Sequence, residues 1–121
     1  MMIYRVIFKV FMLMAMFAMM SFTVVIDAGH GGHDTGAVGL KMGVQEKNLN
    51  LTVAKQLAAK IGEKYPEVKV ILTRDTDVFL PLQQRADIAN KNHADLFISI
   101  HTNAAENRKA CGAETFILGT D

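Results

Sequence analysis

The chain has 121 residues, half of them hydrophobic, with 13 basic and 12 acidic side chains and a formal net charge of +1. This length supports one domain with a modest core. Since the sequence has no basic block and no strong net charge, we expect a monomer with no nucleic-acid partner. The single cysteine, Cys111, cannot form an internal disulfide, and we expect it to be an incidental loop residue.

Residues 1–22 have the pattern of a secretory signal peptide. Arg5 and Lys9 precede an unbroken apolar run over residues 10–20, which is shorter than the roughly 20 residues of a membrane-spanning helix. No clear A-x-A cleavage site follows, so an uncleaved N-terminal anchor is the alternative, and it would be the only membrane contact. We expect a periplasmic or secreted protein with a nearly neutral domain over residues 23–121.

The rest of the chain alternates between strand-like and helix-like segments. β-branched or apolar runs predict buried strands, and apolar residues repeated every four positions predict a helix. In chain order the pattern predicts a strand over residues 23–26, a helix over 46–64, a strand over 68–72, a helix from Pro81 to about Asn92, a strand over 95–100 and a fourth strand over 115–118.

The first helix has a repeating apolar face. Leu49, Val53, Leu57 and Ile61 follow one another at intervals of four, and we expect them to face the sheet. Strands and helices in alternation build a largely parallel sheet, because parallel neighbours need crossover connections. The sequence therefore predicts a three-layer α/β fold with helices on both faces of a central sheet.

Polar side chains follow two of the predicted strands. His30 and His101 leave the carboxyl ends of strands, where open α/β sheets bind ligands, and Glu46 begins the first helix. Alone, each histidine is commonly structural and Glu46 suits the helix dipole. Together, two imidazoles and one carboxylate form the ligand set of a catalytic zinc, whereas structural zinc usually requires cysteines. Asp27 either hydrogen-bonds a ligand imidazole or caps the backbone.

The sequence resembles the zinc-dependent N-acetylmuramoyl-L-alanine amidases of amidase family 3. The likeness rests on "IDAGHGGHDTGAVG", a glutamate that opens a helix, "LTRDTD" and "LQQRADIANKNHADLFISIHTNA", and it extends over residues 24–118. It implies that His30, Glu46 and His101 bind Zn²⁺ and that the chain hydrolyses the amide between N-acetylmuramic acid and L-alanine in peptidoglycan. It also implies supporting or substrate-binding roles for a second set of residues: Asp34, Arg85, Asn90 and Asn103.

The resemblance leaves the proton acceptor open. In the family a glutamate far downstream takes the proton of the attacking water, so we expect this group beyond Asp121. Residues 23–121 would then form the N-terminal portion of the catalytic domain, with the sheet incomplete at its C-terminal end. Glu114 is a weaker candidate, since it more simply begins a strand.

A second class of function stays open. A chain that lacks the proton acceptor would be a metal-containing module that binds peptidoglycan or regulates its cleavage. A phosphate-binding loop is excluded, because neither G-K-S/T nor G-x-G-x-x-G occurs. We interpret His33 and His93 as exposed loop residues.

Overall fold

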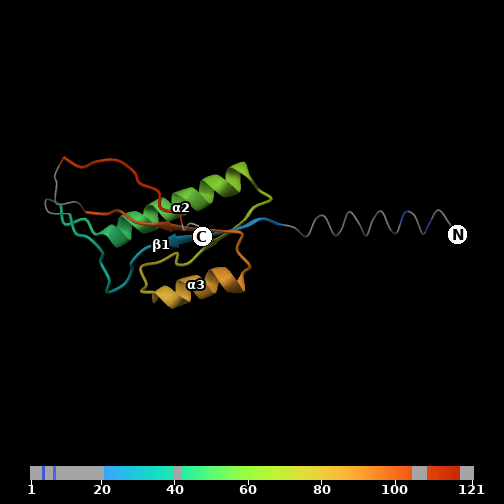
Figure 1. Ribbon diagram of the computed structural model, residues 1–121, viewed down its shortest axis with the longest axis horizontal. Coiled ribbons are helices and arrows are strands. Elements are labelled where there is room, and N and C mark those ends of the chain that lie inside the picture. The colour runs from blue at the N-terminus through green and yellow to red at the C-terminus, as the bar shows by residue number, and fades with distance from the viewer. Residues whose placement is uncertain (1–3, 5–6, 8–20, 40–41, 105–108, 118–121) are drawn as a thin grey trace.

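The computed structural model describes residues 4, 7, 21–39, 42–104 and 109–117 and places a sheet between two helices (Figure 1). The elements are β1 (Thr23–Ala28), α2 (Glu46–Lys64), β2 (Lys69–Leu72), α3 (Leu82–Lys91) and β3 (Leu96–Ile100). Helix α2 covers one face of the sheet and α3 covers the other (Figure 1). The predicted three-layer α/β architecture is confirmed.

The sheet is parallel, with β1 in the centre. Its strand order is β2-β1-β3, and Val25 of β1 pairs with Ile71 on one side and with Phe97 on the other. Strand β1 continues two residues further than the sequence predicts, so Asp27 lies inside the strand, opposite Ser99. The carboxyl ends of β1 and β3 therefore meet at one edge of the sheet.

The core lies between β1 and α2. Every residue of β1 is buried, and Val25 and Ile26 are fully inaccessible. A cluster of Val24, Ile26, Ala28 and Ala54 forms its centre. Burial on both faces explains why the strand is a continuous β-branched run without polar alternation.

The predicted apolar face of α2 is partly wrong. Leu49 and Val53 are each 43% exposed, whereas Asn50 and Ala54 are completely buried. An α-helix turns every 3.6 residues, so a repeat of four drifts by about 40° per step, and the first two members of the stripe face solvent. The partly buried side chains that pack on the core are Leu51, Leu57, Ala58 and Ile61.

The predicted fourth strand does not form in the part of it that the structure describes. Residues 115–117 have no strand pairing, and Phe116 and Ile117 are 82% and 86% exposed. β propensity reflects packing against neighbouring strands, so an apolar run without a neighbour stays irregular. Residue 118 lies outside the described residues. Cys111 is exposed and is not in a disulfide.

The predicted leader falls mostly outside the described residues and stays a prediction. In the described part of the chain, no helix combines the length and hydrophobicity that crossing a bilayer requires.

Truncation of the central strand tests this core. We expect Ile26→Ala to lower the free energy of unfolding by about 2–5 kcal/mol, because Ile26 is fully buried, and Ile26→Val to lower it by about 0.5–1.5 kcal/mol. Leu82→Ala is the control, since Leu82 is 85% exposed and should change stability by less than about 0.5 kcal/mol. Urea unfolding followed by circular dichroism measures all three, and equal losses for Ile26→Ala and Leu82→Ala would contradict the assignment.

Candidate metal centre

Two histidines leave the same edge of the sheet. The amide of Gly29 donates a hydrogen bond to the carbonyl of Ile100 (3.0 Å), which joins the segments that carry His30 and His101. The two imidazole rings meet edge to face, with their centroids 4.9 Å apart. The structure thus brings together two side chains that are 71 positions apart in the sequence.

Glu46 completes the group from the first turn of α2. Its Oε1 lies 3.3 Å from Nε2 of His30 and 3.2 Å from Nδ1 of His101. One possible ligand atom from each of the three residues lies within 4.8 Å of the others. The structure therefore gathers the three ligands that the sequence suggests.

The geometry of these atoms suits zinc. With metal–ligand bonds of 2.0–2.1 Å, two ligand atoms of a tetrahedral zinc are about 3.3 Å apart. Both distances from Glu46 Oε1 to the imidazole nitrogens match this value. Three protein ligands leave a fourth tetrahedral position for water or substrate, as in catalytic sites.

Backbone amides hold the Glu46 carboxylate in place. The side chain is only 6% exposed, and it accepts hydrogen bonds from the amides of Ala37 (2.9 Å) and Thr102 (2.9 Å). Burial alone would raise the pKa of Glu46, but these amides, the side-chain amide of Asn50 and the nearby His30 together keep that pKa below its ordinary value. Glu46 is therefore a charged candidate ligand in the folded protein.

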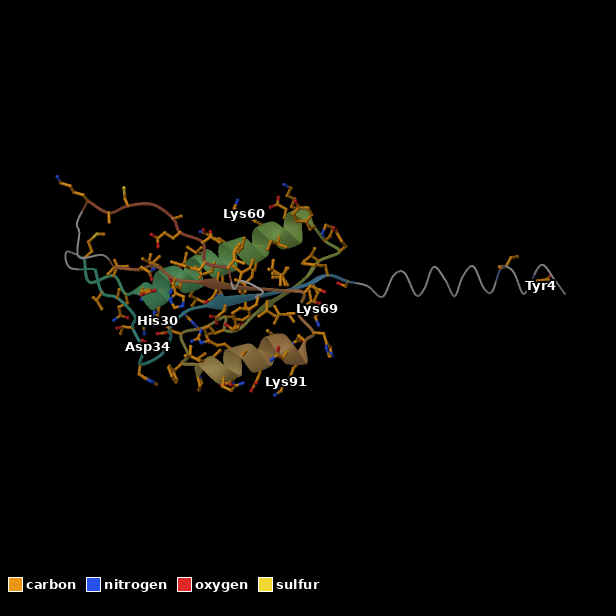
Figure 2. The ribbon with its side chains drawn as sticks, viewed as in Figure 1. Tyr4, His30, Asp34, Lys60, Lys69 and Lys91 are labelled. Carbon is orange, nitrogen blue, oxygen red and sulfur yellow. The ribbon has the colours of Figure 1, made fainter. Side chains whose placement is uncertain are left out.

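Asp34 orients His30. Its Oδ2 lies 2.9 Å from Nδ1 of His30, and Figure 2 shows both side chains where the loop after β1 passes the start of α2. The hydrogen bond with His30 is the main cause that lowers the pKa of Asp34. With Nδ1 held by a carboxylate, the ring keeps Nε2 free to bind a metal ion.

The structure does not bring Asp27 to a ligand imidazole. Its Oδ1 accepts hydrogen bonds from Arg85 (2.7 Å) and Thr73 (2.7 Å), and its Oδ2 accepts one from Ser99 (2.8 Å). The sequence predicts that Asp27 either hydrogen-bonds a ligand imidazole or caps the backbone. Neither alternative included the buried Arg85, which forms an ion pair with this carboxylate. Arg85 also donates to the carbonyl of His30 (2.8 Å), so it contacts a ligand residue through the backbone.

The other candidate residues lie further out. His33 is exposed and stacks on Phe79, with ring centroids 4.1 Å apart. Asn103, His93 and Glu114 are exposed, and none belongs to the group of three possible ligands in the described part of the chain.

Sequence reasoning missed Arg74 and Asn50. Arg74 is 3% exposed and donates to the carbonyls of Ala28 and Gly29, and Asn50 donates to the carbonyl of Gly29 (3.2 Å). The "LTRDTD" motif contains Arg74, and that signal was available. The motif does not show which atoms the guanidinium contacts, because its partners lie 45 residues earlier.

A cavity of about 620 Å³ opens beside the three ligands, between α3 and β3. His30, His101 and Asp34 line it together with Asn90 and a mainly apolar set: Phe79, Leu80, Leu82, Ala86, Ala89 and Phe97. A space of this size next to an open ligand position accommodates a substrate of moderate size.

Asp77 and Lys47 hold the loop that carries His30 through contacts with Gly32. Asp77 accepts the amide of Gly32 (2.8 Å) and the Nζ of Lys47 (2.6 Å), and the same Nζ donates to the carbonyl of Gly32 (2.8 Å). The Lys47 ammonium and the Gly32 amide lower the pKa of Asp77 from its ordinary value of 3.8. The loops after β1 and β2 are thus joined to the start of α2.

Comparisons with known proteins agree with this geometry. The Amidase_3 family, described as N-acetylmuramoyl-L-alanine amidase, matches residues 24–121. The chain is 45% identical over 97 residues to N-acetylmuramoyl-L-alanine amidase AmiC of Escherichia coli O6:H1, which covers 80% of this chain and 23% of that protein.

Solved structures show the same fold. N-acetylmuramoyl-L-alanine amidase AmiC2 of Nostoc punctiforme superposes with a TM-score of 0.67 at 45% identity, over 73% of this chain and 47% of that one. The N-acetylmuramoyl-L-alanine amidase from Clostridium difficile 630 gives a TM-score of 0.70 at 41% identity, over 75% and 48%. The chain therefore spans about a quarter of the curated relative and about half of each solved chain.

Removal of any ligand should abolish metal binding. We expect the parent to bind one zinc ion per chain, and His30→Ala, Glu46→Ala and His101→Ala each to lower the affinity by at least about 100-fold, because each removes a direct ligand. His93→Ala is the matched control, since His93 is exposed and outside the group. Zinc content after dialysis, measured by mass spectrometry, tests this, and unchanged content in all three variants would refute the site.

The Asp77 contact should give a pH-dependent stability. A carboxyl whose pKa is lowered on folding stabilises the protein above its unfolded pKa, and this contribution is lost as pH falls through the folded value. We expect metal-free Asp77→Asn to be less stable than the parent at pH 6, and the gap to close below about pH 3.8. Urea unfolding across this range measures it, with Asp75→Asn, exposed in the same loop, as the control. A gap that does not change with pH would contradict the assignment.

Proposed function

Because the chain belongs to the Amidase_3 family of N-acetylmuramoyl-L-alanine amidases, we propose that it hydrolyses the amide between N-acetylmuramic acid and L-alanine in peptidoglycan, with a zinc ion bound by His30, Glu46 and His101. The single observation that carries this proposal is the convergence of two imidazoles on a buried carboxylate, whose Oε1 lies 3.3 Å from His30 and 3.2 Å from His101.

Each residue of the site has a separate task in this proposal. When bound, zinc would polarise the scissile carbonyl and lower the pKa of a water molecule. Glu46 brings the negative charge, and amides that are already hydrogen-bonded to it hold it still. Asp34 holds His30 with Nε2 toward the ion. His101 is the most exposed of the three, with 44% of its side chain accessible, and it lines the cavity where substrate would enter.

Amide hydrolysis also needs a group that takes the water proton and delivers it to the leaving amine. Glu114 is exposed and lies apart from the three ligands in the described part of the chain. We therefore assign this role to a glutamate outside the described residues, in keeping with the resemblance. The proposed site of action is the periplasm or cell exterior, where peptidoglycan lies, and the signal-like residues 1–22 support that location.

A non-catalytic module is the second candidate. It would hold the metal and bind peptidoglycan without cleaving it. The observation in its favour is that, among the described residues, the only other carboxylate placed beside the three possible ligands, Asp34, is hydrogen-bonded to His30.

Purified peptidoglycan distinguishes the two functions. We expect zinc-loaded protein that carries the proton-accepting glutamate to release stem peptides with a new N-terminal L-alanine, detected by amine labelling, and His101→Ala to lower the release more than about 100-fold because it removes a metal ligand. The control is His93→Ala, which should cleave like the parent. Co-sedimentation with peptidoglycan without amine release would favour the module, and the absence of both would contradict both proposals.

A further inference from the structure

We propose that Arg74 and Arg85 are positioning residues, which hold three consecutive backbone carbonyls and thereby fix His30 for metal binding. The inference rests on the proposed metal site and assigns a role to two side chains that do not touch the ion.

The two guanidinium groups share one short stretch of backbone. Arg74 donates from Nε to the carbonyl of Ala28 (2.9 Å) and from Nη2 to that of Gly29 (3.0 Å). Arg85 donates from Nη1 to the carbonyl of Ala28 (2.8 Å) and from Nη2 to that of His30 (2.8 Å). All three carbonyls from residue 28 to residue 30 are therefore bound by a planar cation.

This stretch has an unusual backbone conformation. His30 has φ of +62°, in the left-handed region that residues with a side chain rarely adopt. A left-handed residue persists only where its surroundings fix it. The direction of the His30 ring depends on the backbone conformation of His30. The hydrogen bonds to the carbonyls of residues 28–30 fix that conformation and therefore the orientation of the ring.

Arg74 also connects two of the ligand-bearing segments. Its Nη2 donates to the carbonyl of Lys47 (2.8 Å) in the first turn of α2, next to Glu46. The hydrogen bonds that the structure gives Arg74 all end on carbonyl oxygens, including that of Thr76 (3.1 Å). The same guanidinium thus holds the turn before His30 against the helix that carries Glu46.

The burial of these cations argues for more than general stability. Arg74 and Arg85 are 3% and 5% exposed, and Arg85 is paired with Asp27 whereas Arg74 relies on carbonyl dipoles. A buried cation held in this way is costly to desolvate and gives little net stability. The planar guanidinium fixes the directions of the carbonyls that it binds, which an apolar side chain of the same size would not do. The arrangement therefore favours preorganisation of His30 over a simple contribution to folding.

The test is the metal affinity of folded variants. Arg74→Lys and Arg85→Lys keep the charge but lose the fork, and we expect each to bind Co²⁺ about 10- to 100-fold more weakly, the range found for residues that support metal ligands. Thr23→Val is the matched control, because Thr23 is 6% exposed at the opposite end of β1 and its hydroxyl bonds only to the Ser21 carbonyl, so the contacts of both arginines stay intact. Circular dichroism and thermal unfolding report the fold, and the visible absorption of bound Co²⁺ reports the ligand geometry.

The outcomes separate the inference from the proposed function. Weaker Co²⁺ binding and an altered spectrum in folded lysine variants, with normal binding by Thr23→Val, would support the positioning role. Affinities equal to that of the parent would overturn the inference and leave the zinc site intact. Failure of the parent itself to bind Co²⁺ would overturn both.

A measurement on the parent covers the case in which the lysine variants do not fold. The Nε–H groups of Arg74 and Arg85 both donate to backbone carbonyls. We expect two arginine Nε–H signals in the metal-free protein that exchange slowly with solvent in nitrogen-15 NMR spectra. Rapid exchange at either arginine would overturn the inference.

Discussion

The metal centre depends on the close approach of the His101 ring to the backbone of Gly29. A Cβ atom at position 29 would lie 2.3 Å from Cε1 of His101, so no residue with a side chain fits there. The same glycine donates its amide to Ile100 and accepts hydrogen bonds on its carbonyl from Asn50 and Arg74. The two peptide groups that flank the Gly29 Cα are therefore in contact with the segments that carry the three candidate ligands, and a shift of this backbone would move them together.

The polar network around Asp27, below Gly29, contributes more to rigidity than to net stability. Asp27 and Arg85 form a buried ion pair at 2.7 Å, and such pairs give little net stability because both charges are desolvated. Thr73 and Ser99 also donate hydrogen bonds to Asp27, so the carboxylate links the ends of all three strands. No buried side-chain nitrogen or oxygen lacks a hydrogen-bond partner in the described part of the protein. The network is therefore complete, and complete networks specify a single arrangement.

The sequence predicts the fold and the ligands better than it predicts their supports. Five of the six predicted elements are present, because β-branched runs and apolar residues at helical spacing indicate the type of element, even where single members such as Leu49 and Val53 are exposed. The prediction of a strand at residues 115–117 was wrong, because a strand needs a neighbouring strand to pair with and a local sequence pattern does not reveal one. His30 and His101 follow strand ends, which parallel topology brings together. The partners of Asp27, and the Gly29 carbonyl that Arg74 binds, lie 45 to 72 residues away in the chain, so only the packed structure reveals them.

The exposure of the three ligands sets the direction from which chemistry takes place. Glu46 is 6% exposed and is covered by α2, whereas His30 and His101 are 24% and 44% exposed. An ion held by these residues would therefore be reached from the side away from α2, through the cavity between α3 and β3 that both histidines line. In the proposed reaction, a scissile carbonyl and the group that takes the water proton would both approach from this side. Because α2 and the amides around Glu46 close the opposite side, any proton acceptor has to belong to a segment that borders this cavity.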